Sequence, residues 1–159
     1  MVAIGEKIPD VNLVDTELKP TDLSKAIDGK PAIIAFFPGA FTSVCTAELC
    51  KFRDSMSEFN SLDGSVYAIS VDGPFSNKAF KEKNGLNFTI LSDYKREAVK
   101  LFGIELNNFA NLSGYTAAKR SVFITDAKGI VRYVWISDNP ATEPDYDEIK
   151  RELGSASKA

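Results

Sequence analysis

The sequence has no histidine, only two cysteines and a single tryptophan among its 159 residues. Without histidine it lacks the usual general base, the usual partner of a nucleophilic thiol and the commonest metal ligand. Two cysteines are too few for a disulfide scaffold. They also make a poor zinc site, because zinc normally takes three or four protein ligands. We therefore expect no metal site, and any thiol chemistry must be activated by other groups.

Long apolar runs and an excess of one charge are also missing. No run approaches the roughly 20 apolar residues that a membrane-spanning helix needs. The opening MVAIGEKIPD lacks the basic leader and the long apolar segment of a signal peptide. The formal net charge of −3 leaves no electrostatic footprint for nucleic acid. We expect a cytoplasmic chain with reduced thiols that binds neither nucleic acid nor a membrane.

Apolar residues make up 44% of the chain, which is enough for one core, so residues 1–159 are expected to form a single domain. Strand and helix patterns alternate along the sequence. Strands are predicted at 31–37, 64–73 and 88–93, helices at 43–60, 76–85, 96–103 and 144–153, and a β-hairpin at 119–137. This order predicts an α/β fold with a central mixed β-sheet flanked by helices.

Two segments show no clear period. Residues 104–119 are rich in Asn, Ser and Gly. A segment this long is either an ordinary surface loop or a functional one. The last six residues, GSASKA, are expected to fray, as chain ends commonly do.

Both cysteines follow a predicted strand, in the stretch FFPGAFTSVCTAELCKFRD. Thr42 or Ser43 can cap the next helix with a hydroxyl, which places Cys45 in its first turn. Free backbone N–H groups and the positive end of the helix dipole favour a thiolate there. Pro38 ends the strand, and Gly39 is expected to let the backbone turn tightly. Cys45 is therefore either a nucleophile activated without histidine or a small buried apolar residue.

Cys50 lies five residues after Cys45. Five residues turn an α-helix by about 140° and advance it by roughly 7.5 Å, so the two Cα atoms would be on the order of 8 to 9 Å apart. A disulfide needs Cα atoms closer than about 7 Å. Either Cys50 is a core residue, or the start of the helix must unwind during function.

The segment PGAFTSVC resembles the Pro-x-x-x-Thr-x-x-Cys motif of the peroxiredoxin family. CTAELCKFRD resembles the peroxiredoxin Q, or bacterioferritin comigratory protein, branch, in which the resolving cysteine can lie five residues after the peroxidatic one. Many members have proline directly after the motif threonine, where this chain has Ser43, and PGAFT is also similar to other branches, including the one-Cys type. The similarity continues in IGEKIPD, YAISVDGP, NFTILSD and RSVFITDAKGIVRYV. This resemblance implies a thioredoxin-like fold.

The same resemblance implies a thiol-dependent peroxidase for hydrogen peroxide and small organic hydroperoxides, without metal, haem or flavin. Cys45 would be the peroxidatic cysteine, oxidised to a sulfenic acid that Cys50 resolves as an intramolecular disulfide. Arg120 matches the family's active-site arginine, whose charge favours a thiolate and whose N–H groups can hold peroxide oxygens. Thr42 matches the hydroxyl that holds sulfur and peroxide, and Pro38 matches the proline that shields the sulfur.

The expected partners are the hydroperoxide and a thioredoxin-like or other dithiol reductant, and the chain is expected to be a monomer or homodimer. Two alternatives are a one-Cys peroxidase reduced directly by an external thiol and a redox-sensing or holdase-type interaction module. A disulfide oxidoreductase is disfavoured because Cys-x-x-Cys is absent. Glu48 matches a family acid that orients arginines, whereas Arg53 is either a second active-site cation or a surface residue. Phe41 either lines the peroxide pocket or lies in the core, and the core is favoured. Trp135 is predicted to lie in the core.

Overall fold

β3 (Ala32–Phe36) is an interior strand of the sheet, and its five residues are all fully buried. Its side chains alternate between two apolar clusters, with Ile33 and Ala35 in one and Ile34 and Phe36 in the other. A strand covered on both faces needs an apolar residue at every position. This explains why PAIIAFF shows no alternation of apolar and polar residues.

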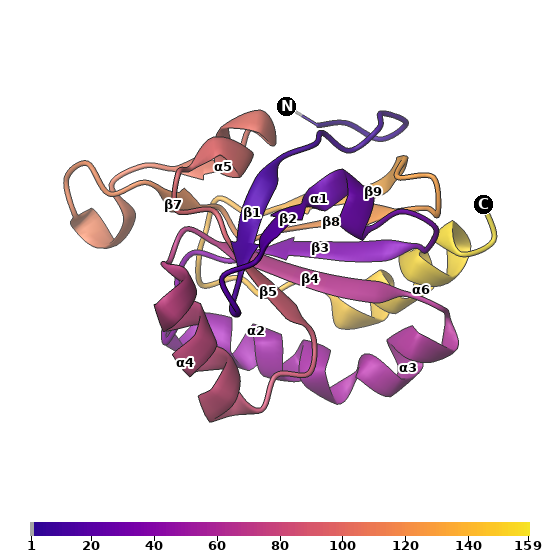
Figure 1. Ribbon diagram of the computed structural model, residues 1–159, viewed down its shortest axis with the longest axis horizontal. Helices are drawn as coiled ribbons and strands as arrows, with labels where there is room; N and C mark the ends of the chain where they lie inside the picture. Colours follow the sequence, from indigo (N-terminus) through magenta and orange to yellow (C-terminus); the bar gives the residue numbers. More distant parts are fainter. Residues whose placement is uncertain (1) are drawn as a thin grey trace.

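β3 belongs to a seven-stranded mixed sheet with the strand order β2-β1-β5-β4-β3-β8-β9. The structure is a computed structural model that describes residues 2–159 (Figure 1). The other strands are β1 (Asn12–Asp15), β2 (Pro20–Asp22), β4 (Ser65–Ser70), β5 (Thr89–Ser92), β8 (Ser121–Thr125) and β9 (Val131–Ile136). β3, β4 and β5 run parallel, whereas the pairs that involve β1, β2, β8 and β9 are antiparallel. The predicted α/β fold with a central mixed sheet is confirmed.

Helices cover both faces of this sheet, as Figure 1 shows. The helices are α1 (Leu23–Ala26), α2 (Ser43–Asp54), α3 (Met56–Ser61), α4 (Pro74–Asn84), α5 (Glu97–Leu101) and α6 (Tyr146–Ala156). Residues of α2, α3, α4 and α6 belong to the apolar cluster on one face, and residues of α1 and α5 belong to the cluster on the other. The helix that carries both cysteines therefore packs directly against the sheet.

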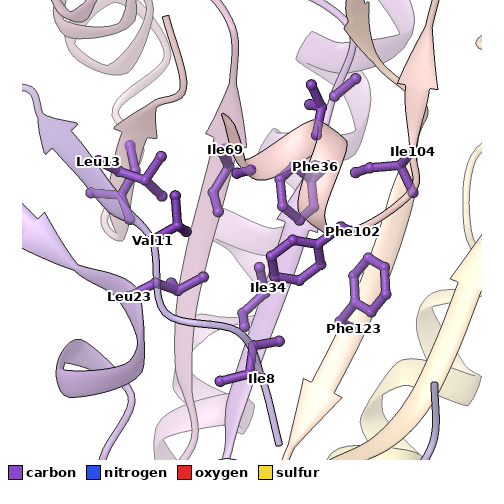
Figure 2. Packing of buried hydrophobic residues seen from close by; sticks show 14 of the residues in the cluster. Ile8, Val11, Leu13, Leu23, Ile34, Phe36, Ile69, Phe102, Ile104 and Phe123 are labelled. Atoms are coloured by element: carbon purple, nitrogen blue, oxygen red, sulfur yellow. The ribbon is translucent and has the colours of Figure 1, made fainter. Parts of the chain in front are cut away.

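Aromatic rings fill the cluster between the sheet and α5 (Figure 2). The ring centroid of Phe36 lies 4.9 Å from that of Phe102 and 6.0 Å from that of Phe123. The rings of Phe102 and Phe123 meet edge to face at 5.0 Å. Tilted and edge-to-face pairs such as these add to the free energy gained by burying the rings. They fix β3 against β8, the two strands that carry the site described below.

The predicted helix at 43–60 is wrong in one respect, because it is broken at Ser55, where the backbone adopts φ −97° and ψ 0° between α2 and α3. The expectation that the last six residues fray is also wrong for the first three of them, residues 154–156. α6 continues to Ala156, which is buried in the core cluster on its face of the sheet. Burial of this apolar side chain favours the helix beyond the point where sequence propensity weakens, because tertiary packing supplies most helical stability.

Two regions hold elements that the sequence pattern did not predict. The segment before β3 contains β1, β2 and α1. Residues 104–119 contain a two-stranded antiparallel sheet of β6 (Glu105–Leu106) and β7 (Ala117–Ala118), with a 3-10 turn η1 (Phe109–Asn111) between them. In Figure 1 this segment extends away from the main sheet beside α5. It is therefore a structured excursion rather than an irregular loop.

Candidate active site

The sheet brings Cys45 and Arg120 together although they are 75 residues apart. β8 runs antiparallel to β3, and Ser121 pairs with Phe36. The residue before β8 must therefore lie beside the residues that follow β3. Those residues lead into α2, and Cys45 is the third residue of that helix. The register of one strand pair thus places the arginine against the first turn of the cysteine helix.

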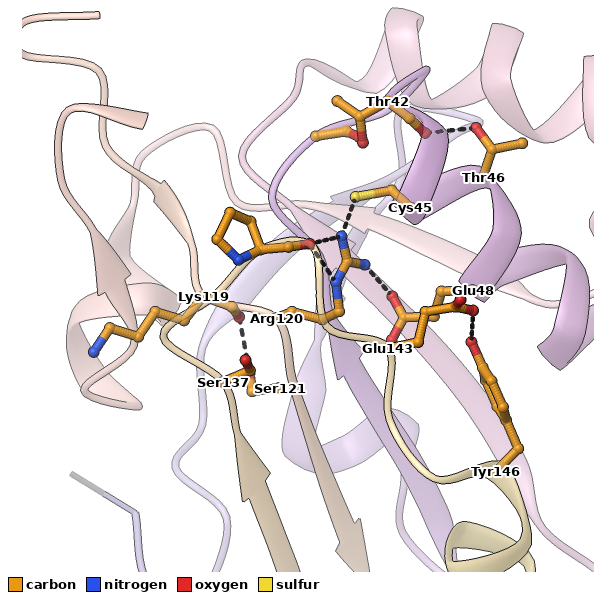
Figure 3. Close-up of polar contacts among 12 residues, drawn as sticks. Thr42, Cys45, Thr46, Glu48, Lys119, Arg120, Ser121, Ser137, Glu143 and Tyr146 are labelled. Atoms are coloured by element: carbon orange, nitrogen blue, oxygen red, sulfur yellow. Dashed lines mark hydrogen bonds and ion pairs between the residues drawn. The ribbon is translucent and has the colours of Figure 1, made fainter. Parts of the chain in front are cut away.

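Arg120 is held by contacts on every nitrogen of its guanidinium (Figure 3). Nη2 donates to Sγ of Cys45 at 3.0 Å, and Nη1 donates to Oε1 of Glu48 at 2.7 Å. Nε and Nη2 both donate to the carbonyl oxygen of Pro140, at 3.1 and 2.9 Å. Arg120 is 1% exposed, and Cys45 and Glu48 are fully buried. A planar cation with this set of partners has one orientation, and it faces the sulfur.

Thr42 occupies the N-cap position of α2, as predicted, but its side chain does not cap the helix. Its hydroxyl donates instead to the carbonyl oxygen of Gly39 at 2.8 Å, and its own carbonyl accepts from the backbone and hydroxyl of Thr46. The tight turn between β3 and α2 was expected at Gly39. The residue with left-handed backbone there is instead Phe41, at φ +67°. The prediction that Phe41 lies in the core is wrong, since it is 51% exposed and rests edge-on against Phe80.

A cavity of about 210 Å³ opens above this cluster. It is lined by Pro38, Thr42, Ser43, Val44, Phe109, Arg120, Pro140 and Ala141. Cys45 itself has no exposed surface and is not among the residues that line the cavity. A small molecule in the cavity would contact Arg120 and Thr42. The sulfur of Cys45 lies 3.0 Å from Nη2 of that arginine.

Glu48 is the acid of the cluster. Burial raises its pKa from the usual 4.5 to about 7, although the ion pair with Arg120 acts in the opposite direction. Its second oxygen, Oε2, is buried and has no hydrogen-bond partner among residues 2–159. Nearby, the hydroxyl of Tyr146 donates to Oε1 of Glu143 at 2.6 Å, and burial together with that bond raises the pKa of Tyr146. The carboxyl group of Glu48 therefore keeps Arg120 in place while it remains close to protonation itself.

This raised pKa makes stability depend on pH. Between the unfolded pKa of 4.5 and the folded pKa of about 7, the native state holds a proton on Glu48 that the unfolded chain has released. Stability must then fall as the pH rises through this window and stay level above it. Replacing Glu48 with glutamine removes the dependence. We expect the variant to gain roughly 2–3 kcal/mol relative to the wild type between pH 5 and pH 8, measured by urea unfolding. A constant difference at both pH values would contradict the assignment.

Cys50 lies outside this cluster. It is half-buried, and its Sγ is 4.0 Å from Oδ1 of Asn84. Arg53 belongs to the same corner, because Nη1 donates to the carbonyl oxygen of Asn84 at 2.6 Å and Nε pairs with Asp54. Arg53 is therefore no second cation beside Cys45. Both cysteines are free thiols in this state.

Two residues of the candidate site, Pro140 and Phe109, could not be identified from the sequence. Pro140 acts through its backbone carbonyl, which any residue type could supply, so no sequence signal identifies it. Phe109 was visible only as an isolated aromatic residue within the polar 104–119 segment. Its approach to the cavity depends on how that segment folds back over the end of β3, which periodicity does not encode.

The comparisons with known proteins agree with this arrangement. Residues 4–134 match the AhpC/TSA family. This chain is a member of that family, the peroxiredoxins. It is 37% identical over 131 residues to chloroplastic peroxiredoxin Q of Populus jackii, covering 82% of this chain and 59% of that protein. With the bcp peroxiredoxin of Coxiella burnetii it shares 31% identity, covering 84% of this chain and 88% of that protein.

Among solved structures, this peroxiredoxin chain is similar to peroxidoxin BcpB of Mycobacterium tuberculosis, with a TM-score of 0.84, 27% identity and 98% of each chain covered. The predicted thioredoxin-like fold and the resemblance to the peroxiredoxin Q and bacterioferritin comigratory protein branch are thereby confirmed. The chain spans only about 59% of the length of the poplar relative. The name of that relative places it in the chloroplast, so the expected cytoplasmic location gains no support. Within residues 2–159, no helix combines the length and apolar character needed to cross a membrane.

Proposed function

We propose that this chain is a thiol peroxidase that reduces hydrogen peroxide and small organic hydroperoxides through Cys45. The observation that carries the proposal is the 3.0 Å contact between Nη2 of Arg120 and Sγ of Cys45, next to a cavity that reaches Arg120. A cation beside a buried sulfur favours the thiolate, and the start of α2 adds the positive end of a helix dipole. Membership of the family and the similarity to peroxiredoxin Q support the same reaction.

The first step is attack by the Cys45 thiolate on the outer oxygen of the hydroperoxide. An S–O bond forms, the O–O bond breaks, and the departing alkoxide or hydroxide takes up a proton to leave as alcohol or water. Negative charge moves from sulfur to oxygen during this step. Arg120 is positioned to follow that charge, because its N–H groups point at the sulfur and border the cavity. Thr42 and Pro38 line the same cavity. We propose that the Thr42 hydroxyl holds the peroxide and that Pro38 shields the sulfur from water.

Glu48 and Pro140 act through the arginine rather than on the substrate. Each accepts hydrogen bonds from the guanidinium, at 2.7 Å and at 2.9–3.1 Å. Together they prevent Arg120 from turning toward solvent when no peroxide is bound. A donor held in place before the reaction needs no reorganisation in the transition state, which is where the rate advantage of such sites arises.

In the second step, Cys50 is proposed to attack the sulfenic acid, so that an S–S bond forms, the S–O bond breaks and water leaves. Only an unwound helix start allows this, because α2 holds both cysteines in one continuous helix. The start of α2 has no side-chain cap, which removes a contact commonly worth about 1 kcal/mol. Leu49 and Phe52 are fully buried and anchor the later part of the helix. An external dithiol of the thioredoxin type would then reduce the disulfide.

The direct test is to locate the oxygen. Reduced Cys50→Ser and Cys45→Ser variants, in which no intramolecular disulfide can form, are each treated with one equivalent of hydrogen peroxide in the presence of dimedone, and the tagged peptide is identified by mass spectrometry. We expect the sulfenic acid adduct on Cys45 of the first variant and none on Cys50 of the second, because a guanidinium N–H contacts the sulfur of Cys45 at 3.0 Å, whereas the sulfur of Cys50 lies 4.0 Å from a neutral amide oxygen. Labelling confined to Cys50, or no thiol oxidation at stoichiometric peroxide, would refute the peroxidase proposal.

A further inference from the structure

The segment between α5 and β8 has no role in the two reaction steps described above, although specific contacts give it a defined structure. β6 and β7 pair Glu105 with Ala118 and Leu106 with Ala117. The guanidinium of Arg96 lies 5.6 Å from the ring centroid of Tyr115. The strand pair joins the two ends of the excursion to each other, and Arg96, which also donates from Nε to the carbonyl oxygen of Thr116, holds its returning limb against the start of α5.

The tip itself is strained around one aromatic residue. Asn108, Ala110 and Asn111 have φ values of +54°, +57° and +61°, so Phe109 is flanked by left-handed residues. Asparagine tolerates this conformation, but alanine has no side-chain group to compensate for it. The turn is held by the backbone N–H of Phe109, which donates to the carbonyl of Tyr115 at 3.0 Å. Strain of this kind persists where the surrounding structure dictates it, often at functional positions.

The strained turn places the ring of Phe109 at the wall of the cavity beside Cys45. Phe109 is half-buried and lines that cavity together with Arg120 and Thr42. Its ring lies over Gly39, since a Cβ placed on that glycine would come within 3.7 Å of Cε2 of the ring. The ring is supported on another side by Tyr115, with the centroids 6.3 Å apart. An aromatic wall in a fixed position thus faces the same space as the guanidinium.

The cavity is larger than hydrogen peroxide requires. Its volume is about 210 Å³, whereas a water molecule takes up roughly 30 Å³ in the liquid and hydrogen peroxide is only one oxygen larger. Besides Phe109, the apolar residues Val44, Pro140 and Ala141 border the remaining space. With the peroxide group at Arg120, an apolar substituent on the other oxygen would fill that space and contact these side chains.

We propose that Phe109 is a specificity-determining residue, whose ring binds the alkyl or aryl group of an organic hydroperoxide. This inference rests on the peroxidase function proposed above and names the substrate class that the site prefers. Cavities that recognise small ligands combine an apolar wall with a few fixed polar groups, and here Phe109 supplies the wall and Arg120 the polar group. Hydrogen peroxide gains nothing from the ring because it has no apolar group.

The test compares Phe109→Ala with the wild type. The rate of Cys45 oxidation is measured by stopped-flow kinetics with cumene hydroperoxide and, separately, with hydrogen peroxide. We expect the rate constant for cumene hydroperoxide to fall roughly 10-fold, with a change of no more than about 2-fold for hydrogen peroxide. Phe109→Leu should keep most of the preference, because leucine retains an apolar side chain of similar reach. Thermal unfolding of each variant shows whether the segment is still folded.

Leu112→Ala is the matched control. Leu112 lies in the same excursion and is 56% exposed, but it does not line the cavity. Its substitution should leave both rate constants unchanged. Equal losses for the two peroxides in Phe109→Ala, or no loss for either, would overturn the specificity role while leaving the peroxidase function intact. A wild-type chain whose Cys45 reacts with neither peroxide would instead overturn the proposed function, and this inference with it.

Discussion

Replacing Arg120 with methionine is expected to slow the oxidation of Cys45 by hydrogen peroxide by roughly 100-fold or more. The substitution removes the N–H group that lies 3.0 Å from the sulfur, and with it the positive charge of the guanidinium. Loss of a single fixed donor at a site of developing negative charge commonly costs two to three orders of magnitude in rate. The rate constant is measured by stopped-flow kinetics, with Cys45→Ser supplying the background.

The same substitution should also destabilise the fold, because it leaves Glu48 buried without its partner. Breaking a buried ion pair from one side typically costs about 3–5 kcal/mol, part of which Glu48 can avoid by taking up a proton. The double variant Glu48→Gln with Arg120→Met separates the two effects. It should regain much of the stability in urea unfolding while oxidation of Cys45 stays slow. Recovery of the rate in the double variant would show that Arg120 only supports the fold.

Arg120→Lys is the conservative comparison. A lysine keeps the charge, but its single ammonium cannot reproduce the separate hydrogen bonds of the guanidinium to Cys45, Glu48 and Pro140. We expect most of the stability to return and most of the rate loss to remain. A lysine variant as fast as the wild type would mean that charge alone, and not the fixed orientation, activates the sulfur.

Replacing Cys50 with serine is expected to reduce turnover with a thioredoxin-type dithiol by roughly 100-fold while the first oxidation of Cys45 proceeds at the normal rate. Cys50 lies in the same helix as Cys45, so its effective concentration at the sulfenic acid far exceeds that of any external thiol. Without it, the sulfenic acid persists and should be oxidised further to sulfinic acid by a second peroxide. Turnover is followed by reductant consumption, and over-oxidation by the mass of the protein.

The accompanying structural change provides an independent measurement. In the wild type, each peroxide should remove two thiols, and amide exchange across residues 43 to 52 should become faster in the oxidised protein, because the helix start must open. Turnover of the serine variant with dithiothreitol is the control for an intact Cys45. If Cys50→Ser turns over like the wild type with the dithiol protein, and the helix stays protected after oxidation, the one-Cys alternative is correct.

Part of the candidate site could be identified from the sequence because it is local. Pro38, Thr42 and Cys45 lie within eight residues, and their order within a strand–turn–helix pattern is sufficient to suggest an activated thiol. Arg120 precedes an ordinary strand and was selected only through the family resemblance. Nothing in its neighbourhood distinguishes it from a surface charge, yet it is one of the most buried side chains in the protein.

The sequence by itself determined the alternation of strands and helices, the mixed sheet and the placement of Cys45 at a helix start, because these depend on periodicity and on residues close together in the chain. Only the tertiary structure decided which distant groups surround the sulfur. The register of β3 with β8 brings in Arg120, the loop before α6 contributes the carbonyl of Pro140, and the strained turn at Phe109 closes the cavity. Each of these depends on a contact across the sheet or between loops, and such contacts leave no periodic trace in the order of residues.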